Sequence, residues 1–176
     1  LASFALRSHS MLALDATASV GLEQHHELAD VIVYSSCKGL FGLTGAAFIA
    51  YNRDQTNEVN SFYLAIDSHK RRLMTGPYHA IQSLAEVLPV HRDFREAVAT
   101  NKRRFVKAMS PHLVWPEENQ PMLCTKVSIN LDSSSGRAVL YRPRSASTGS
   151  VVAHLGEAHL GLKAAGDILE DLKVNE

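Results

Sequence analysis

The sequence predicts an α/β protein in which a first part of alternating helices and strands, residues 1–88, precedes a small α+β domain, residues 89–176. Two features predict the first part: continuous apolar runs that end at turn residues, and an amphipathic helix after them. One feature predicts the second part, because its apolar runs are separated by polar, Ser/Gly-rich loops. The length of 176 residues suits one domain or one and a half.

Three apolar runs in the first part predict strands, and residues 1–9 before them are compatible with a helix. The runs are Met11–Leu14, which ends at Asp15, then Ala29–Tyr34 and Ala46–Tyr51. Each run is continuous and is bounded by small or turn residues, so we expect mainly parallel strands that are buried on both faces of a sheet.

A helix is predicted after Thr75-Gly76-Pro77, because proline is favoured in the first turn of a helix. Its residues Ile81, Leu84, Ala85 and Leu88 form one apolar face. Pro89 is expected to end this helix and to mark the boundary between the two parts.

The second part is predicted to begin with a helix over 91–109. Its inner side is expected to carry Phe94, Ala97, Val98, Phe105 and Ala108. The run Lys102-Arg103-Arg104 with Lys107 fits a solvated outer face, or less well an anion site. Three strands are then predicted at Leu123–Ile129, Ala138–Tyr141 and Ser150–Leu155. A last helix from Glu157 is expected to turn inward Leu162, Ala165, Ile168, Leu169 and Leu172.

Composition excludes several classes of protein. Of all residues, 45% are hydrophobic and 20% are charged, which argues against a disordered chain or a disulfide scaffold. The 18 basic and 18 acidic residues cancel, so the excess positive charge expected of a nucleic-acid binder is absent. No apolar run approaches the roughly 20 residues of a membrane span. Cys37 and Cys124 lie far apart, so we expect reduced thiols, a cytoplasmic protein and no metal site.

Asp15 and Lys38 are the residues most indicative of chemistry. Each follows an apolar strand, and ligands of open α/β sheets gather beyond the carboxyl ends of strands. Lysine is an amine nucleophile that forms Schiff bases, and a carboxylate can keep the ring nitrogen of pyridoxal phosphate protonated. The pair therefore suits a pyridoxal phosphate cofactor, although lysines and strand-end aspartates are common on protein surfaces.

Three segments resemble those of class V, fold-type I aminotransferases. Asp15-Ala16-Thr17-Ala18-Ser19-Val20-Gly21 resembles the segment with the cofactor aspartate, and Ser35-Ser36-Cys37-Lys38-Gly39 resembles the segment with the cofactor lysine. Thr75-Gly76-Pro77 resembles a segment that opens a helix in the same enzymes. The similarity is greatest to 2-aminoethylphosphonate–pyruvate and alanine–glyoxylate aminotransferases. It implies the end of a pyridoxal phosphate-binding large domain, residues 1–88, followed by the small carboxy-terminal domain.

The resemblance also implies roles for single residues. Lys38 would be the catalytic residue, forming the Schiff base and moving a proton, while Asp15 would pair with the pyridinium nitrogen. Thr17 would pack on one ring face, Ser35 would donate to the phosphate, and Thr75 would reach the phosphate of the partner subunit. A homodimer with shared active sites, acting on a small amino donor (for example 2-aminoethylphosphonate) and a 2-oxo acid such as pyruvate, is thus expected, with no nucleic-acid or membrane partner.

Simpler roles and other functions stay open at this stage. Thr75 could only cap a helix, Ser35 could bond within a turn, and Thr17 could be core. Val151 stands where the relatives carry an arginine for the substrate carboxylate, with Arg142 and Arg144 nearby in the sequence. The relatives also have a long upstream portion that holds the cofactor phosphate, so we expect the carboxy-terminal half of a longer enzyme. The alternatives are a pyridoxal phosphate lyase or desulfurase, and a non-catalytic relative that serves as a dimerisation or interaction module.

Overall fold

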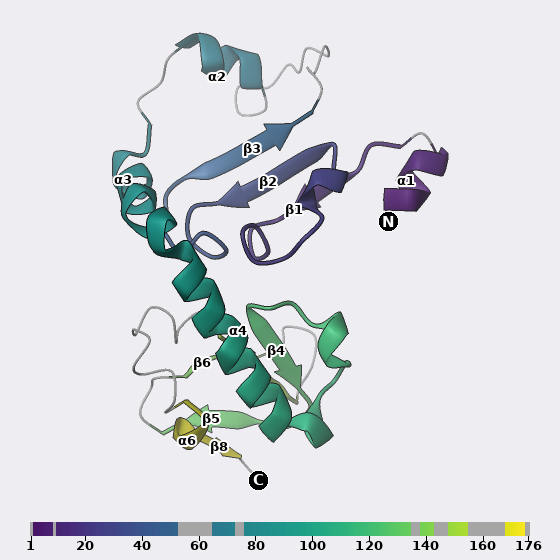
Figure 1. Cartoon of the computed structure of the whole chain (residues 1–176), viewed down its shortest axis with the longest axis vertical. Coiled ribbons are helices and arrows are strands. Elements are labelled where there is room, and N and C mark those ends of the chain that lie inside the picture. Colours follow the sequence, from purple (N-terminus) through teal and green to yellow (C-terminus); the bar gives the residue numbers. More distant parts are fainter. Residues whose placement is uncertain are drawn as a thin grey trace.

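A computed structural model describes residues 2–8, 10–52, 65–72, 76–134, 138–142, 148–154 and 168–174. The first part begins with helix α1 (Ala2–Ser8) and contains a three-stranded sheet of β1 (Ala13–Asp15), β2 (Val31–Ser35) and β3 (Ala47–Tyr51) in that order (Figure 1). The three predicted strands are therefore confirmed. β1 runs parallel to β2, and β3 runs antiparallel to β2, so the described sheet is mixed.

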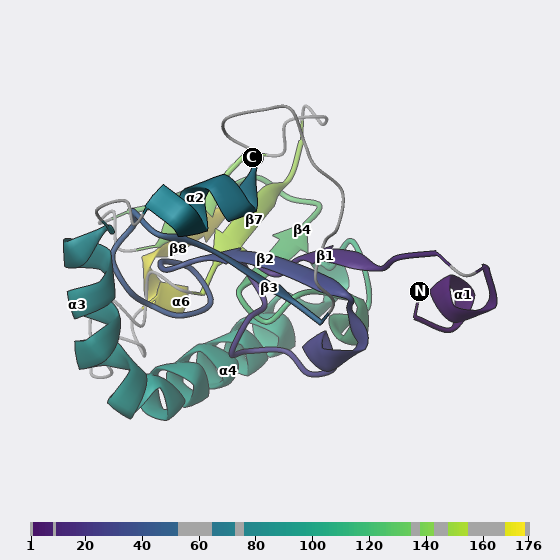
Figure 2. The ribbon, with the colours of Figure 1, turned by 90° about the horizontal axis from the view of Figure 1, so that it is seen from above.

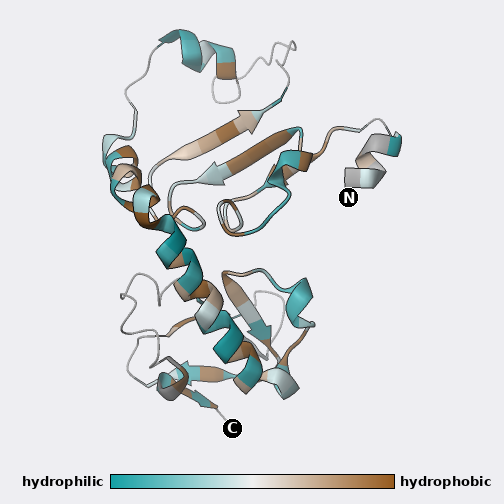
Figure 3. Cartoon of the chain, viewed as in Figure 1, coloured by the Kyte–Doolittle hydropathy of each residue, from teal (hydrophilic) through white to brown (hydrophobic). Residues whose placement is uncertain are grey.

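The faces of this sheet are less buried than its apolar sequence predicts. Val33 of β2 is 39% exposed, and Ile49, directly opposite it on β3, is 49% exposed. On the other face, the rings of Tyr34 and Phe48 stack with centroids 5.1 Å apart. Figure 3 shows apolar residues along both strands. The expectation of burial on both faces is therefore not met among the described residues.

Three helices lead from the sheet to the second part. They are α2 (Ile66–Arg72), α3 (Tyr78–Val87) and α4 (His91–Ala108), with the short 3-10 helix η2 (Leu88–Val90) between the last two. α3 begins directly after Pro77, which is its N-cap rather than a residue of its first turn, and it ends two residues before Pro89, which lies in η2. α4 is the long helix that runs from the first sheet down to the second (Figure 1). The domain boundary after residue 88 stays a prediction.

The described residues of the second part form two small antiparallel sheets. One has the order β4 (Cys124–Val127), β7 (Ser150–Ala153), β6 (Val139–Tyr141), and the other pairs β5 (Leu131–Ser133) with β8 (Leu172–Val174). The short 3-10 helices η1 (His26–Leu28), η3 (Ser110–His112) and η4 (Glu117–Asn119) lie in connecting segments, and α6 (Ile168–Asp171) precedes β8. The strands β5 and β8 were not predicted. Leu172 belongs to β8, so its prediction as a helical residue is wrong, and residues 157–167 of that predicted helix lie outside the described residues.

Two apolar clusters form the core. One comprises Phe105, Val127, Leu131 and Val152, under α4 in the second part. The other joins the two parts, because Leu22 and Phe41 come from the loops after β1 and β2, Val98 comes from α4, and Leu123 precedes β4. The loops at the end of the first sheet are thus anchored in the core.

The inner side of α4 is more polar than predicted. Val98 and Phe105 are buried, but Ala108 is exposed and Asn101 and Lys102 are buried instead. The Lys102 ammonium donates to the carbonyl oxygens of Gln120, at 2.7 Å, and Pro121, at 3.2 Å. The prediction that Lys102 lies on a solvated face is therefore wrong, because its long side chain reaches two carbonyl groups that need a donor.

Candidate active site

Asp15 and Lys38 lie beyond the same edge of the first sheet. β1 and β2 are parallel, with Asp15 opposite Val33, so their carboxyl ends coincide. The Ala16 N–H donates to the Val33 carbonyl at 2.8 Å, and the Gly39 N–H donates to the Thr17 carbonyl at 3.2 Å. These bonds continue the pairing of the two strands into their loops, which lie side by side in both ribbon views (Figures 1 and 2). Both side chains are exposed to solvent.

The carboxylate of Asp15 is held in its ionised form. Thr17 donates its hydroxyl and its backbone N–H to this carboxylate, the latter at 3.0 Å. These hydrogen bonds, with a smaller contribution from the Lys38 charge, lower the pKa of Asp15 below its usual value. An ionised carboxylate at the end of β1 can accept a hydrogen bond from a protonated ring nitrogen.

The loop after β2 is fixed from within by Ser36, which is fully buried. Its hydroxyl donates to the Leu43 carbonyl at 2.6 Å and accepts the Ala46 N–H at 3.2 Å. The Gly42 N–H in turn donates to the Ser36 carbonyl at 2.9 Å. Lys38 therefore projects from a tight loop with defined backbone hydrogen bonds.

Glycines let the loops after β1 and β2 approach each other. A Cβ on Gly39 would lie 2.3 Å from the Val20 carbonyl oxygen, and Gly21 has a left-handed backbone with φ of +76°. Only a residue without a side chain fits the first position, and glycine is strongly favoured at the second. The two glycines in the segments around Asp15 and Lys38 thus have a packing reason to be there.

Ser35 and Cys37 contact each other beside Lys38, with 3.2 Å between Oγ and Sγ. Burial opposes ionisation of the Cys37 thiol, but hydrogen bonds from Ser35, Thr44 and the Lys38 backbone outweigh it, so the pKa of Cys37 lies below its usual value. The Ser35 hydroxyl is accordingly engaged with the thiol in this structure. Thr75 lies outside the described residues.

The charge of Lys38 also acts on the second part of the chain, at Cys124. Burial raises the pKa of the Cys124 thiol, while the charges of Lys102 and Lys38 oppose that shift. Cys124 is the first residue of β4, so Lys38 lies within electrostatic range of the start of this strand. The loops after β1 and β2 also pack on Val98 of α4 and on Leu123, which directly precedes β4, so the candidate site lies next to the second part of the chain.

Val151 lies on the open face of the β4–β7–β6 sheet. Lys126 of β4 and Tyr141 of β6 are directly opposite it in register and share its face. The buried residues Thr125 and Val152 lie on the other face, under α4. The Lys126 ammonium is 5.0 Å from the centroid of the Trp115 ring. Sequence reasoning missed Lys126, because only the register of two strands far apart in the chain brings it beside Val151.

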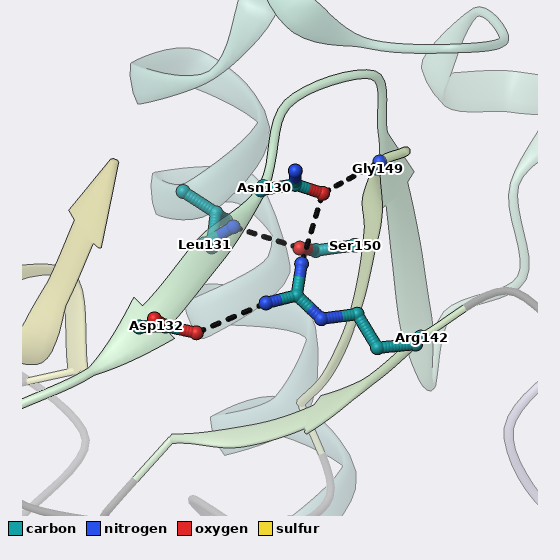
Figure 4. Close-up of polar contacts among 6 residues, drawn as sticks. All are labelled: Asn130, Leu131, Asp132, Arg142, Gly149 and Ser150. Carbon is teal, nitrogen blue, oxygen red and sulfur yellow. Dashed lines mark hydrogen bonds and ion pairs between the residues drawn. The ribbon is translucent and has the colours of Figure 1, made fainter. Parts of the chain in front are cut away.

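Arg142 is already paired. Its guanidinium donates to Asn130 at 2.9 Å and forms an ion pair with Asp132 at 3.1 Å (Figure 4). The same Asn130 oxygen accepts the Gly149 N–H at 2.9 Å, so Arg142 joins β5 to the segment before β7. Arg144, the other arginine considered, lies outside the described residues.

The residues at the sheet edge fit pyridoxal phosphate chemically. An accessible amine, an ionised carboxylate and the hydroxyl of Ser35 are gathered within two adjacent loops, and these are the groups that the aldehyde, the ring nitrogen and the phosphate require. A separate open cavity of about 300 Å³ beside α4 is lined by Glu23, Lys102, Arg103, Glu117 and Glu118 among others, and by none of the predicted site residues. Within the described ranges, no cluster of three or more potential metal ligands occurs, and no helix is long and apolar enough to span a membrane.

His154 is a buried neutral histidine at the end of β7. Its Nε2 lies 2.9 Å from Thr125 Oγ1, its ring packs on Phe105, and its Nδ1 has no hydrogen-bond partner among the residues that the structure describes. Burial, and secondarily the charge of Lys102, lower the pKa of His154 to about 3. The folded protein therefore holds this imidazole neutral at pH 7.

Stability is expected to depend on pH through His154. An unfolded histidine titrates near pH ~6.5, so the contribution is complete above that pH and is lost as the pH falls from there toward about 3. The free energy of unfolding should decrease by up to about 1.4 kcal/mol per pH unit in this range. Urea unfolding between pH 7 and pH 5 should show that His154→Gln weakens this dependence. The exposed His79→Gln should keep it, and an unaltered slope in His154→Gln would contradict the assignment.

The structure is similar to solved aminotransferases. They include alanine–glyoxylate aminotransferase from Nostoc sp., with a TM-score of 0.69 and 15% identity over 96% of this chain. Ureidoglycine–glyoxylate aminotransferase from Bacillus subtilis has a TM-score of 0.62 and 17% identity over 96% of it. Phosphoserine aminotransferase from Cytophaga hutchinsonii has a TM-score of 0.62 and 10% identity over 94% of it.

The chain covers 56%, 60% and 57% of these three structures, so it spans less than two thirds of their length. No protein-family model and no curated protein matches the chain. At this level of identity the likeness shows the fold. The mixed α/β architecture expected from the sequence is therefore confirmed as part of the fold of these aminotransferases.

Proposed function

We propose that this chain, which has the fold of part of the solved aminotransferases, belongs to a pyridoxal phosphate-dependent aminotransferase. The enzyme would move an amino group from a small amino donor to a 2-oxo acid such as pyruvate. The observation that carries this proposal is the position of Asp15 and Lys38 beyond the same edge of the sheet, on parallel strands. 2-Aminoethylphosphonate is the donor that the sequence resemblance suggests.

Each site residue has a defined task in this proposal. When bound, the cofactor supplies an aldehyde for covalent attachment and an electron-withdrawing ring. Lys38 Nζ would hold the cofactor covalently and, once released, carry a proton away from the substrate Cα. The Asp15 carboxylate would accept a hydrogen bond from the ring nitrogen and keep that nitrogen protonated.

Thr17, Ser35 and Thr75 complete the proposed site. Thr17 would lie against the ring while its hydroxyl and N–H keep Asp15 ionised. Ser35 would turn its hydroxyl from Cys37 to the phosphate, a rotation about one side-chain bond. Thr75 would serve the cofactor of a second subunit, which makes the proposed enzyme a homodimer. Two free cysteines, Cys37 and Cys124, support a reducing compartment such as the cytoplasm.

Chemical trapping tests the proposal. The full-length protein would be loaded with pyridoxal phosphate, reduced with borohydride and mapped by peptide mass spectrometry. The pyridoxyl group is expected on Lys38, and a label on another lysine or on none would overturn the assignment. Product analysis with pyruvate and several amines then separates a transaminase from a lyase or desulfurase. A protein without cofactor absorbance would be the non-catalytic relative.

Lys126 is the cation that we propose for the substrate carboxylate. It lies beside Val151 on the open face of the β4–β7–β6 sheet, and among the described residues it has no carboxylate partner. The ring of Trp115, which is 50% exposed, lies under the Lys126 ammonium, and Tyr141, which is 58% exposed, can donate a hydroxyl proton. Arg142 is unsuited, because Asp132 and Asn130 already occupy its guanidinium.

Kinetics of the half-reaction with pyruvate should separate these cations. Lys126→Ala is expected to raise KM for pyruvate about 10-fold to 100-fold, the loss of one charge-assisted hydrogen bond. Arg142→Ala, the matched control, should leave KM unchanged. Val151→Arg should lower KM, because arginine offers a carboxylate two parallel hydrogen bonds. The opposite ranking of Lys126→Ala and Arg142→Ala would transfer the role to Arg142.

A further inference from the structure

We propose that His91, at the start of α4, is a positioning residue that sets the loop carrying Lys38 against the loop carrying Asp15. Its Nε2 lies 2.8 Å from the carbonyl oxygen of Gly39, the residue directly after Lys38. A carbonyl oxygen only accepts, so Nε2 carries the proton and donates it. This proposal rests on the role proposed for Lys38.

The ring of His91 contacts both loops. It packs on Phe41, three residues after Lys38, with ring centroids 4.9 Å apart. Its Cε1–Nε2 edge lies against Gly21, where a Cβ would lie 2.8 Å from Cε1 and 2.9 Å from Nε2. Gly21 ends the segment that begins with Asp15. The imidazole therefore packs against both loops, and it donates a hydrogen bond to the loop that carries Lys38.

Arg95, one turn further along α4, makes the corresponding contact with the first loop. Its Nε donates to the carbonyl oxygen of Leu22 at 3.2 Å. Glu23 adds a third tie, because its carboxylate accepts the Met122 N–H at 2.7 Å. Residues 91 and 95 are four apart and so share one face of the helix. α4 thus holds the ends of both loops from a single rigid surface.

Hydrogen bonds inside the loops transmit the position set by His91 to the backbone of Lys38. The Gly39 N–H donates to the Thr17 carbonyl, and the Phe41 N–H donates to the Lys38 carbonyl at 3.2 Å. The peptide group directly after Lys38 is thus bonded to the first loop and within its own turn, and the next peptide group is bonded to His91. A loop that moves by about 1 Å can cost a reaction up to roughly 100-fold in rate. His91 never needs to touch the substrate to have such an effect.

The contact is independent of the charge of His91. A neutral imidazole with its proton on Nε2 and an imidazolium both donate from that atom. A role of His91 as a proton carrier would instead make activity depend on its ionisation. Positioning and proton transfer are therefore separable by their pH profiles.

The test compares three variants of the full-length protein. His91→Phe keeps a ring of similar size but removes the donor, and His91→Gln removes the ring but keeps an N–H donor. Arg92→Ala is the matched control, because Arg92 is the adjacent residue of α4 and its side chain pairs with Glu96, at 2.9 Å, on the exposed side of the helix. Hydrogen exchange of the Gly39 and Phe41 amides is measured by NMR together with kcat and KM.

His91→Phe is expected to speed exchange at Gly39 and Phe41 about tenfold, the loss of one net hydrogen bond. Exchange at Val127 and Val152, in the second core, should not change. kcat should fall about tenfold or more with little effect on KM, and the pH profile should keep its shape. His91→Gln should recover most of the exchange protection, and Arg92→Ala should match the wild type.

Unchanged exchange at Gly39 in His91→Phe overturns the proposal, even where kcat falls, because His91 would then act by another route. A changed pH profile in His91→Gln overturns it as well, in favour of proton transfer. If the wild-type protein shows no transaminase activity, the exchange data alone still decide whether His91 holds the Lys38 loop. Failure of the proposed function and failure of this inference are thereby distinguished.

Discussion

Lys38→Ala is expected to lower kcat for transamination by about 10³-fold to 10⁴-fold in the full-length protein. The variant loses both the amine that holds the cofactor and the group that moves the substrate Cα proton, and a positioned proton carrier alone contributes about 10²-fold to 10⁴-fold. Because Lys38 is exposed, its removal leaves no cavity, and the melting temperature should not change. Steady-state kinetics and cofactor absorbance measure the two losses.

The control for Lys38 is Lys107→Ala, which removes an exposed lysine from the outer side of α4. It should retain wild-type activity. Addition of a small amine such as ethylamine should restore part of the proton transfer in Lys38→Ala, because the amine can occupy the space of the missing side chain. A Lys38→Ala protein with wild-type turnover would remove this residue from the mechanism.

Asp15→Asn is the second large effect, with an expected loss of about 10²-fold to 10³-fold in the rate of Cα proton abstraction. A neutral amide cannot keep the ring nitrogen protonated, and one charge-assisted hydrogen bond at a reacting centre contributes about this much. The cofactor should still attach to Lys38. Single-turnover kinetics with a Cα-deuterated amino donor isolates the step.

The pH dependence of this effect has a definite sign. The pKa of Asp15 is lowered, so the carboxylate is ionised at every pH above its ordinary value near 4, and its effect should be constant from pH 5 to pH 9. Asp93→Asn, an exposed substitution on α4, serves as the control. Equal proton-abstraction rates in Asp15→Asn and wild type would show that this carboxylate does not serve the ring.

The elements near the candidate site could be predicted because their signals are local. The apolar runs around residues 13–15 and 31–35 end at small residues. Such runs favour parallel pairing in an α/β protein, and this pairing brings Asp15 and Lys38 to the same edge of the sheet. The start of α3 after Pro77 and the span of α4 are likewise visible in the spacing of apolar residues. Local patterns are thus sufficient to predict the part of the candidate site that the loops after β1 and β2 supply, with Asp15 and Lys38.

The remaining contacts depend on pairings that no local pattern encodes. β5 and β8 are each only three residues long and include polar residues, so neither has an apolar run that would predict a strand. They also lie about 40 positions apart, so no local pattern indicates that they pair. Lys102 belongs to a basic run that is typical of a solvated face, yet its side chain is buried, because its ammonium donates to the carbonyl oxygens of Gln120 and Pro121. Lys126 and Val151 become neighbours only through strand register, and His91 meets Gly39 only through the path of α4.

The apolar cluster of Leu22, Phe41, Val98 and Leu123 couples the stability of the fold to the geometry of the candidate site, because Leu22 and Phe41 belong to its two loops. In many enzymes the groups that react stand on loops that tolerate exchange while the scaffold beneath stays constant. Here the two loops contribute residues to the core. A cavity created at Val98 would therefore let Phe41 move, and with it the backbone that carries Lys38. Energies of substitutions in this cluster should not add, and natural variants are expected to change its members together rather than one at a time.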